Sequence, residues 1–441
     1  MKKLKVVTIG GGSSYTPELI EDLIKRYERF PITELCLVDI KEGEKKLEIT
    51  VALAIRMFKA ANLDVKVWGT FDRKNALENA NFVTTQFRVG QLEARAKDEK
   101  IPASHHMLGQ ETNGIGGLFK GLRTIPIVLD IVKEVEEICP DAFIINFTNP
   151  AGMVSEAVNR YTNFKKFLGV CNVPIHLKFE IADTLEVARD DFQIDFIGLN
   201  HMVFGTKAYI NNVDKTKEVL KTYLEKNISM NNIAFLKWED VFINELGLIL
   251  CPYHRYYFQY DEMLKKQEID FKNNEIRAEV VMKYEKELFK KYQDVNLVEK
   301  PKELEQRGGA YYSDVACELL SSLHSNENKV LVVNIKNNGH VKNIDYNDTI
   351  EISCTIDKNG ATPLEHMTEM PKNVLGMYHL FKSYELLACE AAYEKSLDKG
   401  LLALNLSPFT RSDVVNKKMF DEMVIAHKKY LQNYKWERYD K

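Results

Sequence analysis

A glycine-rich turn between an apolar run and a helical pattern opens the chain. The run Leu4-Lys-Val-Val-Thr-Ile9 is rich in β-branched residues and predicts a strand. Gly10-Gly-Gly-Ser-Ser14 follows it directly, and apolar residues then recur at helical spacing from Leu19 to Ile24. A strand, a glycine turn and a helix in this order are typical of the start of a dinucleotide-binding fold. We therefore expect an α/β chain that begins with a Rossmann-like, doubly wound sheet.

The turn and the next strand supply candidate residues for binding NAD. Gly10 permits the tight turn, and Gly12 lets backbone N–H groups approach a pyrophosphate, whose charge the start of the following helix favours. Tyr15 stands where the usual pattern has its third glycine. The second predicted strand ends at Asp39, where a ribose-binding carboxylate is expected. The candidate cofactor-binding residues are thus Gly10, Gly12, Ser13, Ser14 and Asp39.

Strand and helix patterns continue to alternate as far as residue 147. Between two of these patterns, the chain after Arg95 turns polar and then glycine-rich as far as Gly117, through His105, His106 and Glu111. This composition predicts a flexible active-site loop rather than a further layer of the sheet. A later strand leads to Asn149, at the edge where doubly wound sheets bind ligands. The predicted helices are 44–61, 74–79 and 124–138, and the predicted strands are 34–39, 65–68, 82–87 and 142–147.

The rest of the chain has longer helices and late strands. β-rich segments occur at 330–335 and 349–356, and Asn337-Asn-Gly339 between them predicts the turn of a hairpin. Because 441 residues exceed what one core usually supports, we predict two domains. The predicted NAD-binding domain covers 1–170, and an α+β domain for substrate, metal and oligomerisation covers 171–441, with the boundary between 170 and 200. Helical patterns are expected at 210–250, 376–395 and 412–432.

Charge and cysteine content narrow the class of protein. A formal net charge of −4 gives no indication of a basic surface for nucleic acid. Seven cysteines without CxxC spacing indicate a reducing compartment rather than a disulfide framework. No apolar run approaches the ~18 residues of a membrane-spanning helix, and no signal-peptide pattern follows the first methionine. We therefore expect a cytoplasmic protein with no nucleic-acid or membrane partner.

Two residues with metal-binding side chains lie in apolar runs near the middle of the chain. Cys171 follows the run 165–170, where a strand is expected to become a loop, and His201 lies within the run 196–204. A soft thiolate and an imidazole are suitable ligands for Zn, Mn or Fe. The residues alone leave a structural alternative open, because a buried free cysteine often packs as a small hydrophobic side chain.

Three further groups are candidates for chemistry. The segment Cys251–Asp261 is dense in tyrosine. A phenol whose pKa is lowered by a nearby cation can act as a base. Alternatively, the segment is an aromatic stripe packed in a core. The fork of an arginine side chain suits a phosphate, so Arg95 and Arg277 are candidates for phosphate binding. The alternative is that both are solvated residues on helix surfaces. In Arg307–Asp314, glycines beside polar residues indicate close approach to a ligand or the start of a helix.

Five motifs follow one another along the chain. They are Gly10-Gly-Gly-Ser-Ser-Tyr-Thr-Pro-Glu18, Asn146-Phe-Thr-Asn-Pro-Ala-Gly-Met153, Gly169-Val-Cys-Asn-Val-Pro174, Gly198-Leu-Asn-His-Met202 and Pro252-Tyr-His-Arg-Tyr256. In this combination the chain resembles glycoside hydrolase family 4 from about residue 3 to about residue 430. Its Cys-Asn-Val-Pro sequence is similar to the 6-phospho-β-glucosidases of that family. The 6-phospho-α-glucosidases carry an aspartate, used as general acid, where this chain has Asn172, so no general acid is assigned there.

The resemblance implies a glycosidase that works by oxidation and elimination, which is the NAD-dependent exception to two-carboxylate hydrolysis. In the family, NAD+ takes a hydride from C3 of the sugar, and the resulting ketone acidifies the proton on C2. A tyrosine removes that proton, the C1 substituent leaves, water adds, and the hydride returns. The implied reaction is hydrolysis of 6-phospho-β-glucosides to glucose 6-phosphate and an aglycone.

The resemblance also implies a role for individual residues. Cys171 and His201 match the ligands of a divalent metal, usually Mn2+, which polarises the C3 oxygen. Tyr253 matches the base, and Glu111 matches an acid that assists it. Members of the family are usually dimers or tetramers, so we expect a homodimer or homotetramer. The residues that match substrate-binding positions are Arg95, Asn149, Asn172 and Arg277, of which the two arginines are expected on the 6-phosphate.

Two other functions are compatible with parts of the chain. A NAD-dependent hydroxy-acid dehydrogenase would have much the same first 150 residues, but it would produce NADH in every cycle. A sugar-phosphate sensor without catalysis could keep the fold and the ligand. Retention of Cys171, His201 and Tyr253 together argues against the sensor.

Overall fold

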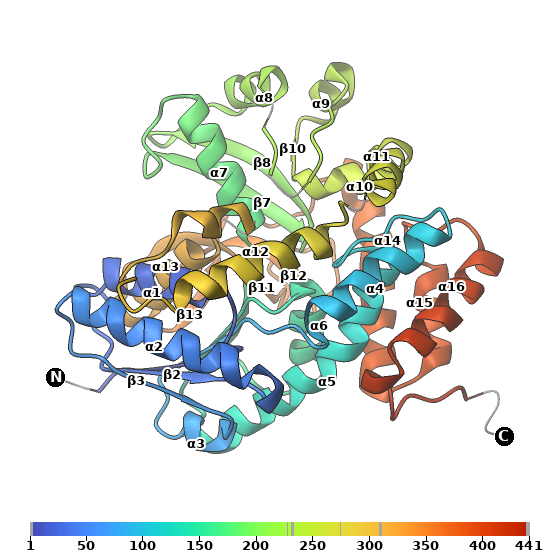
Figure 1. The fold of residues 1–441 in the computed structure, drawn as a ribbon. Helices are drawn as coiled ribbons and strands as arrows, with labels where there is room; N and C mark the ends of the chain where they lie inside the picture. Colours follow the sequence, from blue (N-terminus) through green and yellow to red (C-terminus); the bar gives the residue numbers. More distant parts are fainter. Residues whose placement is uncertain (1–2, 227, 231–232, 274, 308–310, 438–441) are drawn as a thin grey trace.

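The strands of the computed structural model lie in a single mixed sheet (Figure 1). Residues 3–226, 228–230, 233–273, 275–307 and 311–437 are described. The order of strands across the sheet is β10-β8-β7-β12-β11-β6-β5-β4-β1-β2-β3, with β13 beside β12 and β9 beside β8. Strands from both predicted domains therefore belong to the same sheet, and the division between 170 and 200 stays a prediction.

One half of the sheet is parallel and has the order of a dinucleotide-binding fold. The strands β3-β2-β1-β4-β5-β6 pair in parallel, so the chain reverses its direction of winding between β1 and β4. This confirms the expected Rossmann-like sheet. The strands are β1 (Lys5–Ile9), β2 (Glu34–Val38), β3 (Lys66–Thr70), β4 (Phe82–Thr85), β5 (Phe143–Asn146) and β6 (Phe167–Gly169).

The other half of the sheet is antiparallel. It joins the parallel half where Gly169 of β6 pairs with Asn334 of β11. The hairpin predicted around Asn337 is confirmed, because every residue of β11 pairs in antiparallel with a residue of β12. The strands are β7 (Phe192–Leu199), β8 (Met202–Ile210), β9 (Val213–Asp214), β10 (Ile249–Leu250), β11 (Lys329–Lys336), β12 (Thr349–Asp357) and β13 (Gly360–Pro363).

Helices cover both faces of the sheet and close a hydrophobic core on each (Figure 1). Adjacent residues of β1 enter different cores, since Val6 belongs to the first core and Val7 to the second. Strands buried on both faces have nearly continuous apolar sequences, which explains the short apolar runs. The first core receives residues of α1 (Thr16–Lys25), α2 (Glu44–Ala60), α7 (Asn172–Thr184) and α13 (Tyr312–Ser325), and the second those of α3 (Arg73–Leu77), α5 (Gly114–Ile138), α6 (Ala151–Tyr161), α15 (Leu397–Asn405) and α16 (Asp413–Ala426).

The remaining helices surround these layers. The long helix α14 (Lys372–Glu394) contributes to both cores, and α16 is shorter than the helix predicted at 412–432. The region 210–250 holds β9, β10 and two short helices, where only helix had been expected. No helix of the described residues is long and apolar enough to cross a membrane. The other helices are α4 (Gln91–Ser104), α8 (Thr216–Glu225), α9 (Asp240–Leu246), α10 (Arg255–Phe258), α11 (Tyr260–Lys272) and α12 (Arg277–Tyr292), with 3-10 turns at Lys41–Gly43, Pro252–His254, Lys302–Arg307 and Lys428–Tyr430.

The prediction of a flexible loop from residue 96 to residue 117 is wrong. Most of this segment is helical, because α4 spans Gln91–Ser104 and α5 begins at Gly114, ten residues before the predicted start at 124. The buried side of α4 carries Asp98 and Glu99 beside its apolar residues. Apolar periodicity, the usual sign of an amphipathic helix, is therefore missing from its sequence. Only residues 105–113 form a connection between the two helices.

A buried ionic cluster fixes α4 in place. Two nitrogens of the Arg123 guanidinium, on α5, donate to the Asp98 carboxylate at 3.0 and 2.6 Å. His427, which follows α16, places Nε2 3.0 Å from the same carboxylate. Solvent does not reach any of the three side chains. Helices from two distant parts of the chain are thus joined through one buried carboxylate.

We expect Arg123→Met to reduce the free energy of unfolding by about 3–5 kcal/mol, because the change leaves Asp98 as an uncompensated buried charge. Urea denaturation followed by circular dichroism would measure the difference. The control is Lys215→Met, which removes an exposed ion pair with Glu218 and should change the free energy by less than about 1 kcal/mol. Equal midpoints for Arg123→Met and the unmodified protein would show that the cluster does not stabilise the fold.

Candidate active site

A cavity of about 500 Å³ opens beside the point where the parallel strands reverse their order of winding. Its wall combines loops that follow β1, β4 and β5 with residues of α4, α12 and the Pro252–His254 turn. Gly10, in the turn after β1, has φ +91°, and a Cβ there would be 2.9 Å from the carbonyl carbon of Gln86, which lines the cavity. The residues predicted for the site that line the cavity are Ser13, Arg95, Glu111, Asn149, Asn172, Tyr253 and Arg277.

The remaining nucleotide-binding candidates pack around the glycine turn. The Gly12 N–H, which was expected to face a pyrophosphate, donates to Asp39 Oδ2 at 2.7 Å. Asp39 also accepts from the backbone N–H of Ile40. Ser14 is buried, and its hydroxyl donates to Glu285 on α12 at 3.2 Å. The turn and the β2 carboxylate therefore form one unit at the start of α1, which suits a dinucleotide lying across this edge of the sheet.

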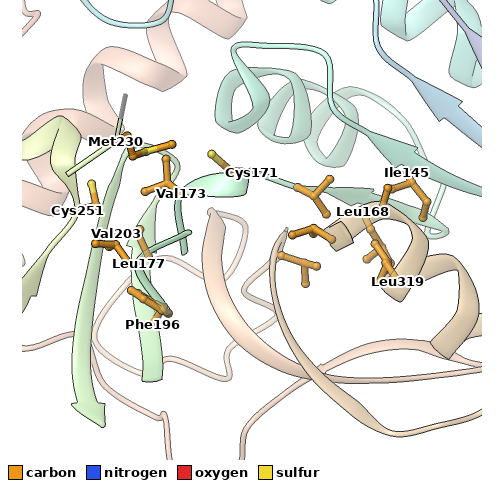
Figure 2. Packing of buried hydrophobic residues seen from close by; sticks show 14 of the residues in the cluster. Ile145, Leu168, Cys171, Val173, Leu177, Phe196, Val203, Met230, Cys251 and Leu319 are labelled. Carbon is orange, nitrogen blue, oxygen red and sulfur yellow. The ribbon is translucent and has the colours of Figure 1, made fainter. Parts of the chain in front are cut away.

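Cys171 follows the short strand β6 by two residues and stands directly before α7, where a loop had been expected. Figure 2 shows its side chain beside Val173 in the first core, and 2% of the residue is exposed. Burial and the nearby Glu351 raise the pKa of the thiol far above its usual value, and Val173 and Asn200 oppose this only in part. A metal ion that binds here would therefore displace the thiol proton.

His201 lies in the turn of the β7–β8 hairpin, with φ +63°. Burial, followed by the charge of Lys120, lowers the pKa of His201 to about 3, so the imidazole is neutral and has a lone pair for a metal. The Cys251 thiol donates to the His201 carbonyl at 3.4 Å and holds this turn. The His201 ring stacks on Tyr253, with centroids 3.7 Å apart and an interplanar angle of 4°.

The donor chemistry of Cys171 and His201 fits a divalent metal with open coordination positions. Among the described residues, no group of three or more His, Cys, Asp or Glu side chains could hold a metal ion. A thiolate and a neutral imidazole would therefore be completed by oxygen atoms of water or substrate. Catalytic metal sites keep such positions open, whereas structural sites close them with protein ligands.

The surroundings of Tyr253 are not those expected for a phenol whose pKa a neighbouring cation lowers. Burial raises the pKa of Tyr253 strongly, and electrostatic interactions with Tyr256, Cys171 and Glu111 raise it further. A hydrogen bond with Thr112 acts in the opposite direction. With these neighbours alone, the hydroxyl keeps its proton at neutral pH.

Glu111 lies at the centre of a buried group of charges. Arg88 Nε donates to its Oε1 at 2.6 Å, Arg95 Nη1 lies 3.1 Å from its Oε2, and Lys120 Nζ also contacts Oε1. Burial would raise the pKa of Glu111, but the three cations outweigh burial and hold it well below its usual range. Burial lowers the pKa of Lys120 to about 8, because one carboxylate does not offset desolvation and two neighbouring guanidiniums.

Three guanidiniums meet at another wall of the cavity. Glu99 accepts from Arg95 Nε at 2.7 Å and from the Ala278 N–H, at the start of α12, at 2.8 Å. Arg277, the first residue of α12, donates to the backbone carbonyl of Arg307. Burial lowers the pKa of Arg277, and the charges of Arg95 and Arg307 lower it further. Arg307 lies over the ring of Tyr15 at 4.0 Å, and its Nε is buried without a hydrogen-bond partner among the described residues.

Sequence reasoning missed several charged residues of this cavity. Lys120 had no signal, because it is one of several charged residues in α5. Arg88 lies between a predicted strand and the segment expected to be a flexible loop, and no motif marked it. Arg307 was noticed for its glycine neighbours, but Gly308, Gly309 and Ala310 lie outside the described residues. The structure brings the three cations to the lining of the same cavity.

Known protein families match both halves of this chain. Residues 5–187 match the family described as family 4 glycosyl hydrolase, and residues 196–410 match the C-terminal domain of that family. The chain belongs to glycosyl hydrolase family 4. The family membership expected from the five motifs is therefore confirmed.

Relatives of this family 4 chain cover nearly all of it. It is 49% identical to the probable 6-phospho-β-glucosidase of Bacillus subtilis (strain 168), over 98% of this chain and 98% of that protein. It is also 49% identical to the 6-phospho-β-glucosidase of Escherichia coli (strain K12), over 98% of this chain and 97% of that protein. The solved 6-phospho-β-glucosidase from Thermotoga maritima, with manganese, NAD+ and glucose 6-phosphate, is 35% identical and has a TM-score of 0.88. That match covers 97% of this chain and 99% of the solved one.

We expect Glu111→Gln to lower the pKa of Lys120 below about 8, because the change removes an attractive charge while burial and the two guanidiniums remain. Reductive 13C-methylation of lysines followed by an NMR pH titration would measure the shift, and Lys120→Arg would identify the resonance. A Lys120 pKa that stays the same or rises in Glu111→Gln would contradict the proximity of the two groups.

Proposed function

We propose that this family 4 glycosidase is a NAD- and divalent-metal-dependent 6-phospho-β-glucosidase that releases glucose 6-phosphate and an aglycone. The observation that carries the proposal is the group of Arg95, Arg277 and Arg307 in a cavity beside the glycine turn. In the described part of the chain, no ion pair joins Arg277 to a carboxylate, and the neighbouring guanidiniums lower its pKa. A bound anion would offset this excess of positive charge.

The 6-phosphate of the sugar is the anion that we assign to this wall. A phosphate monoester carries between one and two negative charges at neutral pH and accepts paired hydrogen bonds from a guanidinium fork. Glu99 holds Arg95 in a fixed orientation and also binds the start of α12, which carries Arg277. Both arginines therefore have defined positions before a substrate arrives.

The residues also fit the two cofactors. Gly10, Gly12, Ser13, Ser14 and Asp39 would hold NAD+, and Cys171 and His201 would hold Mn2+ or a similar ion. When bound, NAD+ supplies a hydride acceptor, and the divalent metal supplies a Lewis acid that makes a sugar C–H next to a carbonyl more acidic. The relative from Thermotoga maritima was solved with both groups.

Tyr253 is the base that we propose for the C2 proton. Because its described neighbours keep it protonated, the positive charge of a divalent ion held by Cys171 and His201 would be needed to favour the phenolate. It lines the cavity, and its ring is fixed against His201 by stacking. The negative charge of Glu111 raises the pKa of Tyr253 and so increases the basicity of the phenolate. Thr112 acts in the opposite direction and lowers the pKa of Tyr253. Glu111 thus acts on Tyr253 through its charge, while Arg88, Arg95 and Lys120 keep Glu111 itself ionised.

Asn172 and Asn149 complete the substrate-binding set. Asn172 is the first residue of α7 and lines the cavity beside the predicted metal ligand. An amide cannot donate a proton as an acid at neutral pH, so Asn172 binds substrate but does not protonate the leaving group. Asn149 donates to the Tyr312 hydroxyl at 3.3 Å, which fixes its side chain at the end of β5.

The proposal also covers the assembly of the protein and its location in the cell. We keep a homodimer or homotetramer as the expected assembly. All seven cysteines are buried and unpaired, which supports the prediction of a reducing compartment such as the cytoplasm.

We expect p-nitrophenyl β-D-glucoside 6-phosphate to be cleaved only when NAD+ and Mn2+ are both present, with no net NADH. The unphosphorylated glucoside and the α-anomer of the phosphorylated one serve as matched substrates. Release of nitrophenol and absorbance of NADH would be followed together under reducing conditions. In deuterated water, the glucose 6-phosphate formed should carry deuterium at C2.

Each alternative outcome has a distinct meaning. Cleavage of the unphosphorylated sugar would show that Arg95 and Arg277 do not act as ligands of a 6-phosphate. Product without deuterium at C2 would rule out proton abstraction at that carbon. Steady accumulation of NADH without cleavage would indicate a dehydrogenase. Binding of glucose 6-phosphate without any turnover would indicate a sensor.

We expect Arg277→Met to lower kcat/KM for the phosphorylated substrate about 10- to 100-fold, because one hydrogen bond to a charged group contributes about 1.5–3 kcal/mol. Steady-state kinetics at saturating NAD+ and Mn2+ would measure the loss. The control is Arg411→Met, since Arg411 is exposed, pairs with Asp261 and does not line the cavity. Equal losses in the two variants would contradict a phosphate-binding role for Arg277.

A further inference from the structure

A short irregular segment, residues 233–238, borders the active-site cavity, and we call it the strap. Ile233 and Ala234 at its start line the cavity, and Ile233 is 4% exposed. The strap is neither helix nor strand, so no ladder of backbone hydrogen bonds fixes it. Contacts with neighbouring elements therefore set its position.

Arg255 on α10 holds the end of the strap. Its Nε donates to the Leu236 carbonyl at 3.0 Å. Its guanidinium also lies 5.0 Å from the ring centroid of Trp238 and 5.3 Å from that of Phe235, within reach of cation–π attraction. Arg255 is 1% exposed, and both of its Nη atoms lack a hydrogen-bond partner among the described residues. Burying a guanidinium in this way is costly, and the contacts that it makes in return are with the strap.

The strap is tied to the two elements that carry residues proposed for the reaction. The arginine that holds its end follows Tyr253 by two positions. At its start, the Ile233 carbonyl accepts from the Ser229 hydroxyl at 3.3 Å, and His176 on α7 places Nε2 3.2 Å from the Ser229 carbonyl. His176 lies one helical turn after Asn172. In the described part of the chain, no hydrogen bond joins the strap to α4 or α12, which carry the arginines of the phosphate wall.

The chemistry of the sugar decides which part of a substrate the strap would meet. Tyr253 is proposed to act on C2, and the glycosidic oxygen on C1 is two bonds from C2. The phosphate on C6 is proposed to lie at the wall of arginines. The substituent on C1 therefore lies on the side of Tyr253, where the strap borders the cavity.

The groups around this part of the cavity offer little to a polar aglycone. The ring centroid of Tyr256 is 5.9 Å from that of Tyr253, and Met263 of α11 adds an apolar side chain to the lining. The Gln110 amide donates to the Tyr256 hydroxyl and accepts from Thr112, so it is already engaged. A second sugar would leave hydroxyl groups without partners here, whereas an apolar group would gain from burial.

We propose that the strap is the aglycone wall of this enzyme and selects apolar aglycones, such as alkyl or aryl groups, over a second sugar. Arg255 is the positioning residue of this wall, which gives a role to the arginine of the Pro252–Tyr256 motif. Selection between substrates depends on the difference in their transition-state binding, and an added methylene changes that binding measurably. The inference rests on the proposed function, because Tyr253 must act on C2.

A series of alkyl β-glucoside 6-phosphates, from methyl to butyl, tests the wall directly. Their leaving groups differ little in acidity, so kcat/KM reports contact with the wall. With NAD+ and Mn2+ bound, we expect kcat/KM to rise about 10-fold or more from methyl to butyl. The cyclohexyl glucoside should also exceed cellobiose phosphorylated on its non-reducing glucose, although a sugar hydroxyl is the more acidic leaving group.

Variants of the strap and of its holder should change this dependence and nothing else. Ile233→Ser should remove most of the rise from methyl to butyl. Arg255→Met should do the same, and Arg255→Lys, which keeps a donor for the Leu236 carbonyl, should recover part of it. Glucose 6-phosphate has no aglycone, so its dissociation constant, measured by calorimetry with NAD+ and Mn2+ present, should stay the same in each variant.

Two matched controls should keep the full dependence on chain length. Ile269→Ser changes an exposed isoleucine of α11 that does not line the cavity. Arg56→Met removes another arginine whose Nε donates to a backbone carbonyl, that of Leu297, away from the cavity.

The outcomes separate this inference from the proposed function. If no phosphorylated β-glucoside is cleaved, the proposed function fails and the aglycone wall fails with it. If the glucosides are cleaved but kcat/KM does not depend on chain length, or the phosphorylated cellobiose exceeds the cyclohexyl glucoside, only the aglycone wall is refuted. An unchanged slope in Ile233→Ser, or a loss of glucose 6-phosphate affinity in that variant, would also refute it.

Discussion

The pairing of Gly169 with Asn334 is the constraint on which the site depends, because it joins a parallel sheet to an antiparallel one. Between β6 and β7 lie β11 and β12, and each spacing between neighbouring strands is about 4.8 Å. The segments that follow β6 and β7 carry Cys171 and His201, the two residues that we propose as metal ligands. A continuous sheet holds both segments to one rigid frame. These two residues, 30 positions apart in sequence, therefore have fixed relative positions.

The cavity is also defined by an imbalance of charge. Arg88, Arg95 and Lys120 converge on Glu111, whereas Arg277 has no carboxylate partner among the described residues. Folding alone does not neutralise this wall, because desolvated guanidiniums lower one another's pKa. An anion that binds only the folded state shifts the folding equilibrium toward it. Substrate recognition and stability of this region are therefore coupled through the same charges.

Much of the parallel half could be predicted from sequence, because the residues that define each strand are neighbours in the chain. Each strand there is short, apolar and followed by a turn, so its end, and a residue such as Asn149, could be placed directly. The motifs for Cys171, His201 and Tyr253 also lie at ends of strands or in turns. Each was recognisable because several residues of fixed spacing accompany it.

The parts that could not be predicted depend on contacts between distant segments. Helix α4 buries Asp98 and Glu99, whose partners come from α5, α12 and residue 427, so its own sequence has no apolar stripe. Lys120 is a buried cation, and its place in the site depends on its contact with Glu111. The junction of β6 with β11 pairs residues that are far apart in sequence, and nothing in either strand specifies the other.

The cluster of Asp98, Arg123 and His427 has a consequence for the order in which the protein matures. Arg95 lies one turn before Asp98 on α4, and His427 comes from the last fifteen residues of the chain. The helix that carries Arg95 is therefore fully anchored only after residue 427 has been synthesised. The contact of the Gly12 N–H with Asp39, by contrast, joins residues within the first 40. These two parts of the site thus gain their supports at different stages of synthesis, the glycine turn before the wall that carries Arg95.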